Sequence, residues 1–388
     1  MPHHPGLYQW FDVVSNHFPK LSKPQVWGLA LWSFGMVVAR SCSLSAVAGI
    51  LAPLTGQSFN TVRERLRDTY RESKAKHGKH RAQIDMDECW GPWLTWVLNG
   101  WSTQQVAIAI DATTLGKRFV VLAISVLYRG CAVPVAWKIL SATEKHPWKP
   151  EWLGLLKHFK NVVPQNWKVI VLADRGLYAK WLFRGIVSLG WHPMLRINQQ
   201  GAFRPDGQYR WKFLTRLVPV VGRTYASQGT IFRSKEAQLR CTLLGRWDKG
   251  YEDAWLILTD LPPDAADACW YGMRAWIEQG FKRIKRGGFQ WQYTRMDDPE
   301  RAERLWFTLA LATWWALSVG GEAEASIPVE TLPQTPGSAR KKKNRWCSMG
   351  VFRRGLNLIM AALLMHKAIP IGCGIPENWP ILPQRGGS

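Results

Sequence analysis

The chain has 388 residues, 47% of them hydrophobic, enough for a large buried core plus one or two smaller domains. Lys and Arg number 51 against 28 Asp and Glu, and this formal net charge of +23 favours a polyanionic partner such as nucleic acid. A protein that is merely basic is the alternative. The seven cysteines form no C-x-x-C pair and no Cys/His cluster, which argues against a disulfide framework or structural zinc and fits a reducing cytosol.

Two uncharged apolar runs, Val26–Ala39 and Leu305–Val319, are 14 and 15 residues long. A membrane span needs roughly 20 residues, so both runs predict buried helices. The first residues, MPHHPGLYQWFD, lack the basic region and apolar stretch of a secretory signal. We therefore expect a protein without a membrane span that stays inside the cell.

Residues 7–79 are predicted to be helical. A short helix, the turn at Thr55–Gln57 and a basic helix over Thr61–Tyr70 resemble a helix-turn-helix, which makes Arg63, Arg65 and Arg67 candidate DNA contacts. A small helical bundle whose last helix shows a solvated face explains the same pattern. The basic cluster at 74–81 either follows a phosphate backbone or acts as a linker.

Strand-like residues begin at Val106, and two of the predicted strands run directly into a lone aspartate, Asp111 in IAIDATT and Asp174 in VLADRG. The predicted order is three strands, a helix, a strand, a helix and a strand, which is the order of the ribonuclease H-like core. In open α/β sheets functional residues gather at the carboxyl ends of strands, where both aspartates are expected. The predicted strands are 106–110, 119–127, 132–140, 167–173 and 192–197, with helices at 151–162 and 178–189.

The predicted fold class is α/β: a ribonuclease H-like catalytic core with an inserted β subdomain, preceded by an all-helical N-terminal DNA-binding region. The expected parts are a helical DNA-end-binding domain (1–100), the core (101–197 and 263–320), the β insertion (198–262), and a linker with a C-terminal helical region (321–388). Strands are expected in the insertion at 209–214, 216–221, 230–232, 237–244 and 254–258. The linker contains the basic run 340–345, and the helix at 351–366 is either a subunit contact or simple packing.

The helix predicted over 264–286 carries four polar residues, Tyr271, Arg274, Glu278 and Lys285, within about 60° of one another on an ideal α-helix. An apolar stripe lies beside them. Glu278 has Arg274 four residues before it and Lys282 four residues after it, so a solvated, salt-bridged face explains the pattern equally well. Spacing on this helix alone does not decide between a site and a surface.

Together these motifs resemble a known family. Tyr271-x2-Arg274-x3-Glu278-x6-Lys285 is similar to the Y-R-E-K signature of DDE transposases of bacterial insertion sequences, in the insertion-sequence-four family. The contexts of Asp111 and Asp174 and the long β insertion also resemble that family. The resemblance covers about 106–319 and implies a bacterial, cytoplasmic, nucleoid-associated protein.

The resemblance implies that Asp111, Asp174 and Glu278 are catalytic and hold two Mg²⁺ ions, for which Mn²⁺ can substitute, with Asp111 bridging both. Carboxylate oxygens suit Mg²⁺, and two ions can activate an attacking hydroxyl and steady the leaving oxygen of a phosphodiester.

Tyr271, Arg274 and Lys285 are expected to grip DNA phosphates beside the metals. Arg175 is either a further phosphate contact or an ion pair that steadies the strand end. Trp255 resembles the tryptophan that stacks on a flipped base in the family, although most of the 24 tryptophans must be core residues.

The expected function is that of a DNA transposase which binds terminal inverted repeats and target DNA, as a homodimer on DNA. Two alternatives stay open. One is a nuclease or immobile recombinase relic on the same fold, and the other is a non-enzymatic basic DNA-binding protein. A glycosidase using two carboxylates would not explain the charge or the phosphate-binding helix.

Overall fold

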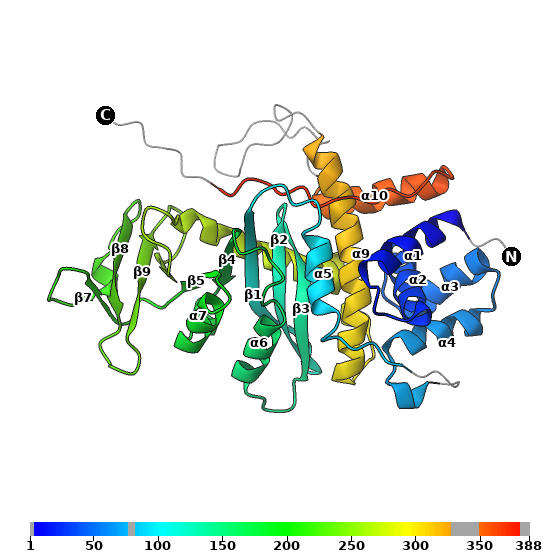
Figure 1. Cartoon of the computed structure of the whole chain (residues 1–388), viewed down its shortest axis with the longest axis horizontal. Helices are drawn as coiled ribbons and strands as arrows, with labels where there is room; N and C mark the ends of the chain where they lie inside the picture. Colours follow the sequence, from blue (N-terminus) through cyan, green and yellow to red (C-terminus); the bar gives the residue numbers. More distant parts are fainter. Residues whose placement is uncertain (1–3, 77–81, 327–348, 381–388) are drawn as a thin grey trace.

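The computed structural model describes residues 4–76, 82–326 and 349–380. A central sheet lies between an N-terminal helical bundle at one end of the molecule and the strands of the insertion at the other (Figure 1). The long helix α9 stands between the sheet and the bundle. The basic run 340–345 and residues 77–81 of the first basic cluster lie outside the described residues.

The first five strands follow the predicted order, and the middle one, β1, pairs in parallel with β4 and antiparallel with β2. β4 also pairs in parallel with β5, so the sheet order here is β3-β2-β1-β4-β5. Arg129 and Gly130 both have positive φ, 45° and 73°, as a two-residue hairpin turn between β2 and β3 requires. The elements are β1 (Gln105–Leu115), β2 (Phe119–Tyr128), β3 (Cys131–Ser141), α6 (Trp148–Lys157), β4 (Lys168–Ala173), α7 (Lys180–Val187) and β5 (His192–Arg196).

The register of β1 on β4 brings the two aspartates together. Their last parallel pair is Ile110 with Ala173, so Asp111 and Asp174 are the next residues on neighbouring strands. The prediction that the first strand ends at Ile110 was wrong. β1 continues to Leu115 because its pairing with β2 goes on after its pairing with β4 has stopped.

The insertion continues the same sheet, since β10 pairs antiparallel with β5 and the order then runs β9-β8-β6-β7. The predicted strand at 216–221 was wrong: Leu214–Arg216 forms a 3₁₀ turn, and Pro219 has no N–H for a ladder. The strand predicted at 209–214 shrinks to two residues, whereas the one at 230–232 is part of a longer strand. The strands are β6 (Ala202–Pro205), β7 (Lys212–Phe213), β8 (Thr224–Ile231), β9 (Leu239–Arg246) and β10 (Trp255–Thr259).

Local signals explain the boundaries of the N-terminal helices. Ser22 and Gln25 form a capping box before α2, and Gly56, with φ of 61°, ends α3 in the left-handed conformation. Ser58 caps α4 by accepting a hydrogen bond from the backbone N–H of Thr61 at 3.2 Å. The helices are α1 (Pro5–His17), α2 (Lys23–Ala39), α3 (Leu44–Thr55), α4 (Phe59–Tyr70) and α5 (Trp90–Val97).

Within the described ranges, no single helix has the length and apolarity to cross a membrane, although α2 and α3, bent by 101°, pass such a test as a pair.

Helix α9 (Pro299–Ala325) is buried on all sides from residue 302 to residue 321, where it packs against β3, α2 and α10 (Val351–Leu364). Its two buried charged side chains have polar partners: Glu303 accepts hydrogen bonds from Ile139 N at 2.9 Å and Lys138 Nζ at 3.0 Å, and Arg304 Nε donates to the Tyr70 carbonyl at 2.6 Å. Gly355 lets α10 approach closely, because a Cβ there would lie 1.7 Å from the carbonyl oxygen of Ala316.

The segment after α10 is held to the β2–β3 hairpin by Glu377. Its Oε1 accepts a hydrogen bond from Arg129 N at 2.8 Å, while its Oε2 is buried and has no hydrogen-bond partner among the described residues. Burial raises the pKa of Glu377 to about 7, although Arg129 opposes the shift. Because the folded-state pKa lies above the unfolded one, the stability that this group contributes is present at low pH and is lost as pH rises towards 7.

We therefore expect Glu377→Gln, which stays neutral, to flatten the dependence of unfolding free energy on pH. At pH 8 the variant should be more stable than the wild type by about 1 to 3 kcal/mol. Denaturant unfolding between pH 5 and pH 8 measures this. Glu322→Gln is the control, because this exposed carboxylate accepts a hydrogen bond from Cys373 of the same segment. If the unfolding free energies of the wild type and Glu377→Gln changed equally with pH, Glu377 would not be the source of the pH dependence.

Candidate active site

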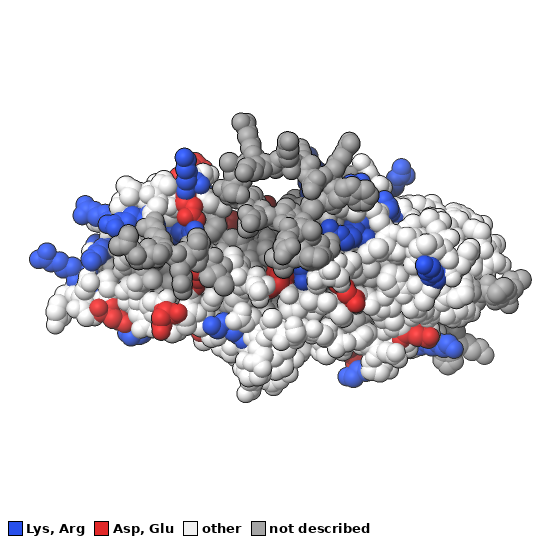
Figure 2. Space-filling model, turned by 90° about the horizontal axis from the view of Figure 1, so that it is seen from above, with Lys and Arg blue, Asp and Glu red and all other residues white. Residues whose placement is uncertain are grey.

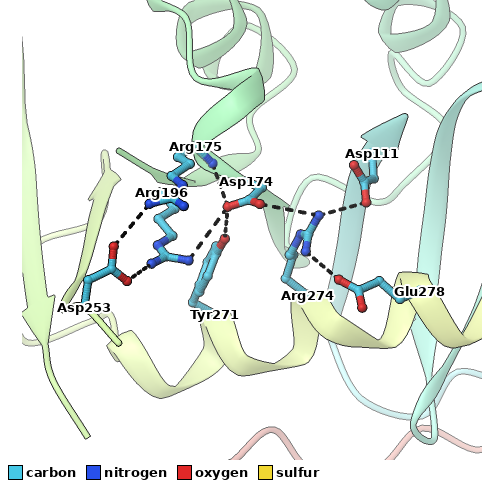
Figure 3. A network of polar contacts seen from close by, with 8 residues as sticks. All are labelled: Asp111, Asp174, Arg175, Arg196, Asp253, Tyr271, Arg274 and Glu278. Atoms are coloured by element: carbon cyan, nitrogen blue, oxygen red, sulfur yellow. Dashed lines mark hydrogen bonds and ion pairs between the residues drawn. The ribbon is translucent and has the colours of Figure 1, made fainter. Parts of the chain in front are cut away.

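Three carboxylates from distant parts of the sequence point toward one another at the edge of the sheet (Figure 3). Asp111 lies on β1, Asp174 directly follows β4, and Glu278 lies on α8 (Trp276–Lys282). The backbone N–H groups of Ala112 and Arg175 donate to the two aspartates at 2.9 and 2.8 Å. The aspartate side chains are 18% and 35% exposed and Glu278 is 61% exposed, so the set is open to solvent on the helix side.

A single guanidinium group, that of Arg274, contacts all three. Its Nη2 lies 2.8 Å from Asp111 Oδ2 and 3.8 Å from Asp174 Oδ2, and its Nη1 lies 2.8 Å from Glu278 Oε1. The side chain of Arg274 is only 15% exposed. Because the site is partly buried, the guanidinium group and the three carboxylates attract one another strongly.

The electrostatics reflect this burial. Burial raises the pKa of Asp111, and the charge of Arg274 opposes that shift. For Arg274 itself burial lowers the pKa, but Asp111 and Asp174 outweigh it and the pKa is raised. Arg274 therefore stays protonated, and its positive charge stabilises the ionised carboxylates around it.

The helix that carries Arg274 and Glu278 is not a regular α-helix, contrary to the prediction. It runs as a 3₁₀ segment (Ala268–Ala275), α8, and a π segment (Arg283–Gly287). In a 3₁₀ helix residues three apart lie on one line, which aligns Tyr271 with Arg274. At Gly280 the helix touches β3 so closely that a Cβ would lie 2.7 Å from the Ala132 carbonyl oxygen. The predicted apolar stripe is buried at Met273, Ile277, Phe281 and Ile284.

Tyr271 and Lys285, the outer members of the four-residue signature, both contact the sheet. Tyr271 is 4% exposed, its hydroxyl donates to Asp174 Oδ1 at 3.2 Å, and burial raises its pKa. Lys285 Nζ donates to Thr113 Oγ1 at 2.5 Å, and burial, with Arg286 nearby, lowers the Lys285 pKa. Tyr271 thus orients a carboxylate, a role that its spacing did not indicate.

Trp255 begins β10 and is half-buried. Its ring makes edge-on contacts with Tyr251, at 4.7 Å between ring centroids, and with Tyr271, at 5.2 Å. Trp255 therefore touches the tyrosine that donates to Asp174. Arg175 is 54% exposed, and its Nη1 pairs with Asp253 Oδ2 at 3.2 Å.

The sequence that forms this site is similar to that of a known protein family. The family described as the transposase DDE domain matches residues 103–315, more than half of the chain. The chain belongs to that family. The matched span of the transposase domain contains Asp111, Asp174 and Glu278, together with the whole β insertion.

A search among curated proteins finds no match to this chain. Among solved structures the chain is similar to a piggyBac transposase in a synaptic complex with hairpin DNA, at 10% sequence identity, with 92% of this chain and 77% of that chain covered and a TM-score of 0.42.

Two residues of the transposase domain that contact the site were not found from sequence, Arg196 and Asp253. Arg196 ends β5, and its Nη2 lies 2.5 Å from Asp253 Oδ1 while its Nη1 lies 3.9 Å from Asp174 Oδ1. The rule that singled out Asp111 and Asp174, a polar residue at the end of a parallel strand, also applies to Arg196. Asp253 lies in the turn before β10, where one of several acids in an exposed polar loop carries no signal.

Outside the transposase domain, the three arginines of α4 have different surroundings. Arg65 donates to Gln57 Oε1 at 3.0 Å, and Arg67 pairs with Glu64. Arg63 lines a cavity of about 650 Å³ between α3, α4 and residues 290–301, which Arg295 also lines. None of the three site carboxylates borders that cavity.

The donor chemistry of the site fits a hard divalent cation, because three carboxylates already converge on one positive group. Across the described parts of the chain, no three His, Cys, Asp or Glu side chains stand close enough to hold a metal ion as they are. The guanidinium of Arg274 lies between the carboxylates. Asp111, Asp174 and Glu278 are the residues that would hold divalent ions, and they would do so in place of their present contacts with Arg274.

Proposed function

We propose that the protein is a DNA transposase of the insertion-sequence-four type, which binds the ends of its own element, cleaves them and joins them to target DNA. The observation that carries the proposal is the convergence of Asp111, Asp174 and Glu278 on Arg274 inside the span of the transposase DDE domain. Phosphoryl transfer needs concentrated positive charge beside the reacting phosphate, and this arrangement can hold it.

The topology supports the proposal. Three parallel strands flanked by an antiparallel hairpin, in the order β3-β2-β1-β4-β5, agree with a ribonuclease H-like core. Asp111 and Asp174 are neighbours directly after the last parallel pair of β1 and β4, at the point where β4 ends.

In the proposed mechanism Asp111, Asp174 and Glu278 hold Mg²⁺, for which Mn²⁺ can substitute. When bound, two such ions activate a water or a DNA 3′-hydroxyl and stabilise the leaving oxygen. Other residues of the chain orient the carboxylates and bind the DNA. Tyr271 fixes one oxygen of Asp174, and Arg274, freed from the carboxylates, offers its planar fork to a DNA phosphate. Lys285, which Thr113 holds, adds a second positive group beside Asp111.

Surface charge supports DNA as the partner. Figure 2 shows Lys and Arg side chains gathered at the end of the molecule that β8 and β9 form. Each phosphate that such residues neutralise releases counterions, so binding should weaken steeply with salt. Further proposed DNA contacts are Arg63 in its cavity and Trp255 beside Tyr271, together with Arg65, Arg67 and Arg175. Joining two ends implies a homodimer on DNA.

The proposal is tested with DNA that carries the sequences flanking the gene. The purified chain should cut this DNA at defined positions only with Mg²⁺ or Mn²⁺ and should join the ends to a second duplex. A nuclease relic would cut without joining. A non-enzymatic DNA-binding protein would bind with strong salt dependence and never cut. Either outcome would contradict the proposed function.

A further inference from the structure

Asp253 belongs to the insertion, yet it contacts two arginines of the core, Arg175 and Arg196, that lie beside Asp174. Its Oδ1 pairs with Arg196 Nη2 at 2.5 Å, and its Oδ2 pairs with Arg175 Nη1 at 3.2 Å. Arg175 follows β4 and Arg196 ends β5, so one carboxylate collects the guanidinium groups from the ends of two neighbouring parallel strands (Figure 3). Arg274 contacts the other carboxylate oxygen of Asp174, Oδ2, at 3.8 Å, whereas Tyr271 donates to Oδ1, the oxygen that Arg196 also faces.

Arg196 lies between two acids. Its Nη1 is 3.9 Å from Asp174 Oδ1, its side chain is 16% exposed, and its Nε is buried without a hydrogen-bond partner in the described structure. A guanidinium in this position is drawn to whichever carboxylate is charged and near. With Asp253 present, the shorter contact goes to Asp253 and Asp174 keeps only the longer one.

Asp174 has little room for a second guanidinium. Its Oδ1 already accepts hydrogen bonds from Arg175 N at 2.8 Å and from the Tyr271 hydroxyl at 3.2 Å, and Arg274 lies 3.8 Å from its Oδ2. If Arg196 closed onto Asp174, it would neutralise the charge that a divalent ion needs.

We propose that Asp253 is a positioning residue that draws Arg196 and Arg175 away from Asp174 and so keeps Asp174 available to a divalent cation. This inference rests on the proposed function. A purely structural role for the Asp253–Arg196 pair, fastening β10 to β5, is a weaker explanation, because the two strands are already joined by their own ladder at Ile257 with Arg196 and Leu258 with Leu195.

The test measures binding of Mn²⁺ to the full chain without DNA, using the electron paramagnetic resonance signal of the free ion. Asp253→Asn should weaken Mn²⁺ binding about 10- to 100-fold, as the loss of partners around metal ligands commonly does. Asp253→Glu should stay near wild type. Asp206→Asn is the matched control, since Asp206 pairs with Arg240 on the exposed part of the same insertion. Asp206→Asn should leave the Mn²⁺ affinity unchanged.

A second substitution separates positioning from structure. If Arg196 moves onto Asp174 when Asp253 is neutral, then adding Arg196→Gln to Asp253→Asn should recover most of the lost Mn²⁺ affinity. A double variant as weak as Asp253→Asn, or a single variant with wild-type affinity, would overturn the inference while leaving the proposed function intact. A wild type whose Mn²⁺ binding does not depend on Asp174 would overturn the proposed function, and the inference with it.

Discussion

Replacing Asp111 with Asn should reduce Mg²⁺-dependent DNA cleavage by about 10³-fold or more while DNA binding persists. The substitution keeps the shape of the side chain and removes the charge at the most buried of the three carboxylates. Metal ions commonly contribute several kcal/mol to such reactions, and each 1.36 kcal/mol corresponds to tenfold in rate. Asp174→Asn and Glu278→Gln should behave alike, as measured by cleavage of end-labelled DNA.

Binding assays on the same variants separate catalysis from recognition. DNA affinity should change little or rise slightly, because each variant loses one negative charge beside a polyanion. Asp260→Asn is a suitable control, since Asp260 pairs with His192 at the opposite end of β5 and β10. Retention of cleavage by any one of the three variants would remove that residue from the site.

Replacing Arg274 with Ala should have the second largest effect, and it should show first in stability. Without its guanidinium the three carboxylates lose the cation that they share, so in metal-free buffer the free energy of unfolding should fall by about 3 kcal/mol. Mg²⁺ should then restore stability to the variant more than it stabilises the wild type, because the ion no longer displaces an internal cation. Thermal unfolding with and without Mg²⁺ measures both effects.

The matched control is Arg67→Ala, which breaks an exposed pair with Glu64 on α4 and should cost less than about 1 kcal/mol with no response to Mg²⁺. Arg274→Lys should lie between Ala and wild type, because an ammonium group cannot reach all three acids as a planar fork does. An Arg274→Ala variant as stable as wild type in metal-free buffer would contradict the central role of this residue.

The strands and the helix that carry the site could be predicted from sequence, because they depend on local patterns of residues. Strand-like runs that lead into a lone aspartate placed Asp111 on a strand and Asp174 directly after one, and the register of β1 on β4 makes them neighbours. The stripe on the later helix singled out Arg274 and Glu278. What periodicity could not supply is that one guanidinium contacts all three acids, since that depends on how the helix lies across the sheet.

Where the sequence misled, long-range contacts explain the difference. A regular α-helix was expected over 264–286, but tight contact with β3 at Gly280 accompanies a helix of mixed 3₁₀, α and π geometry. Arg196 and Asp253 are 57 residues apart and meet only because β10 returns to pair with β5. The family resemblance supplied the transposase assignment, which the match to residues 103–315 confirms at the level of the DDE domain. The narrower assignment stays a prediction.

The central claim is that Asp111, Asp174 and Glu278 form one divalent-ion site that Arg274 fills when no ion is bound. Crystals of the chain with DNA of its own element ends, grown with Mn²⁺, test this most directly through anomalous scattering. We expect Mn²⁺ peaks within coordination distance of all three carboxylates, with Arg274 turned towards a DNA phosphate. Three carboxylates still closed on Arg274, with no anomalous peak among them, would contradict it.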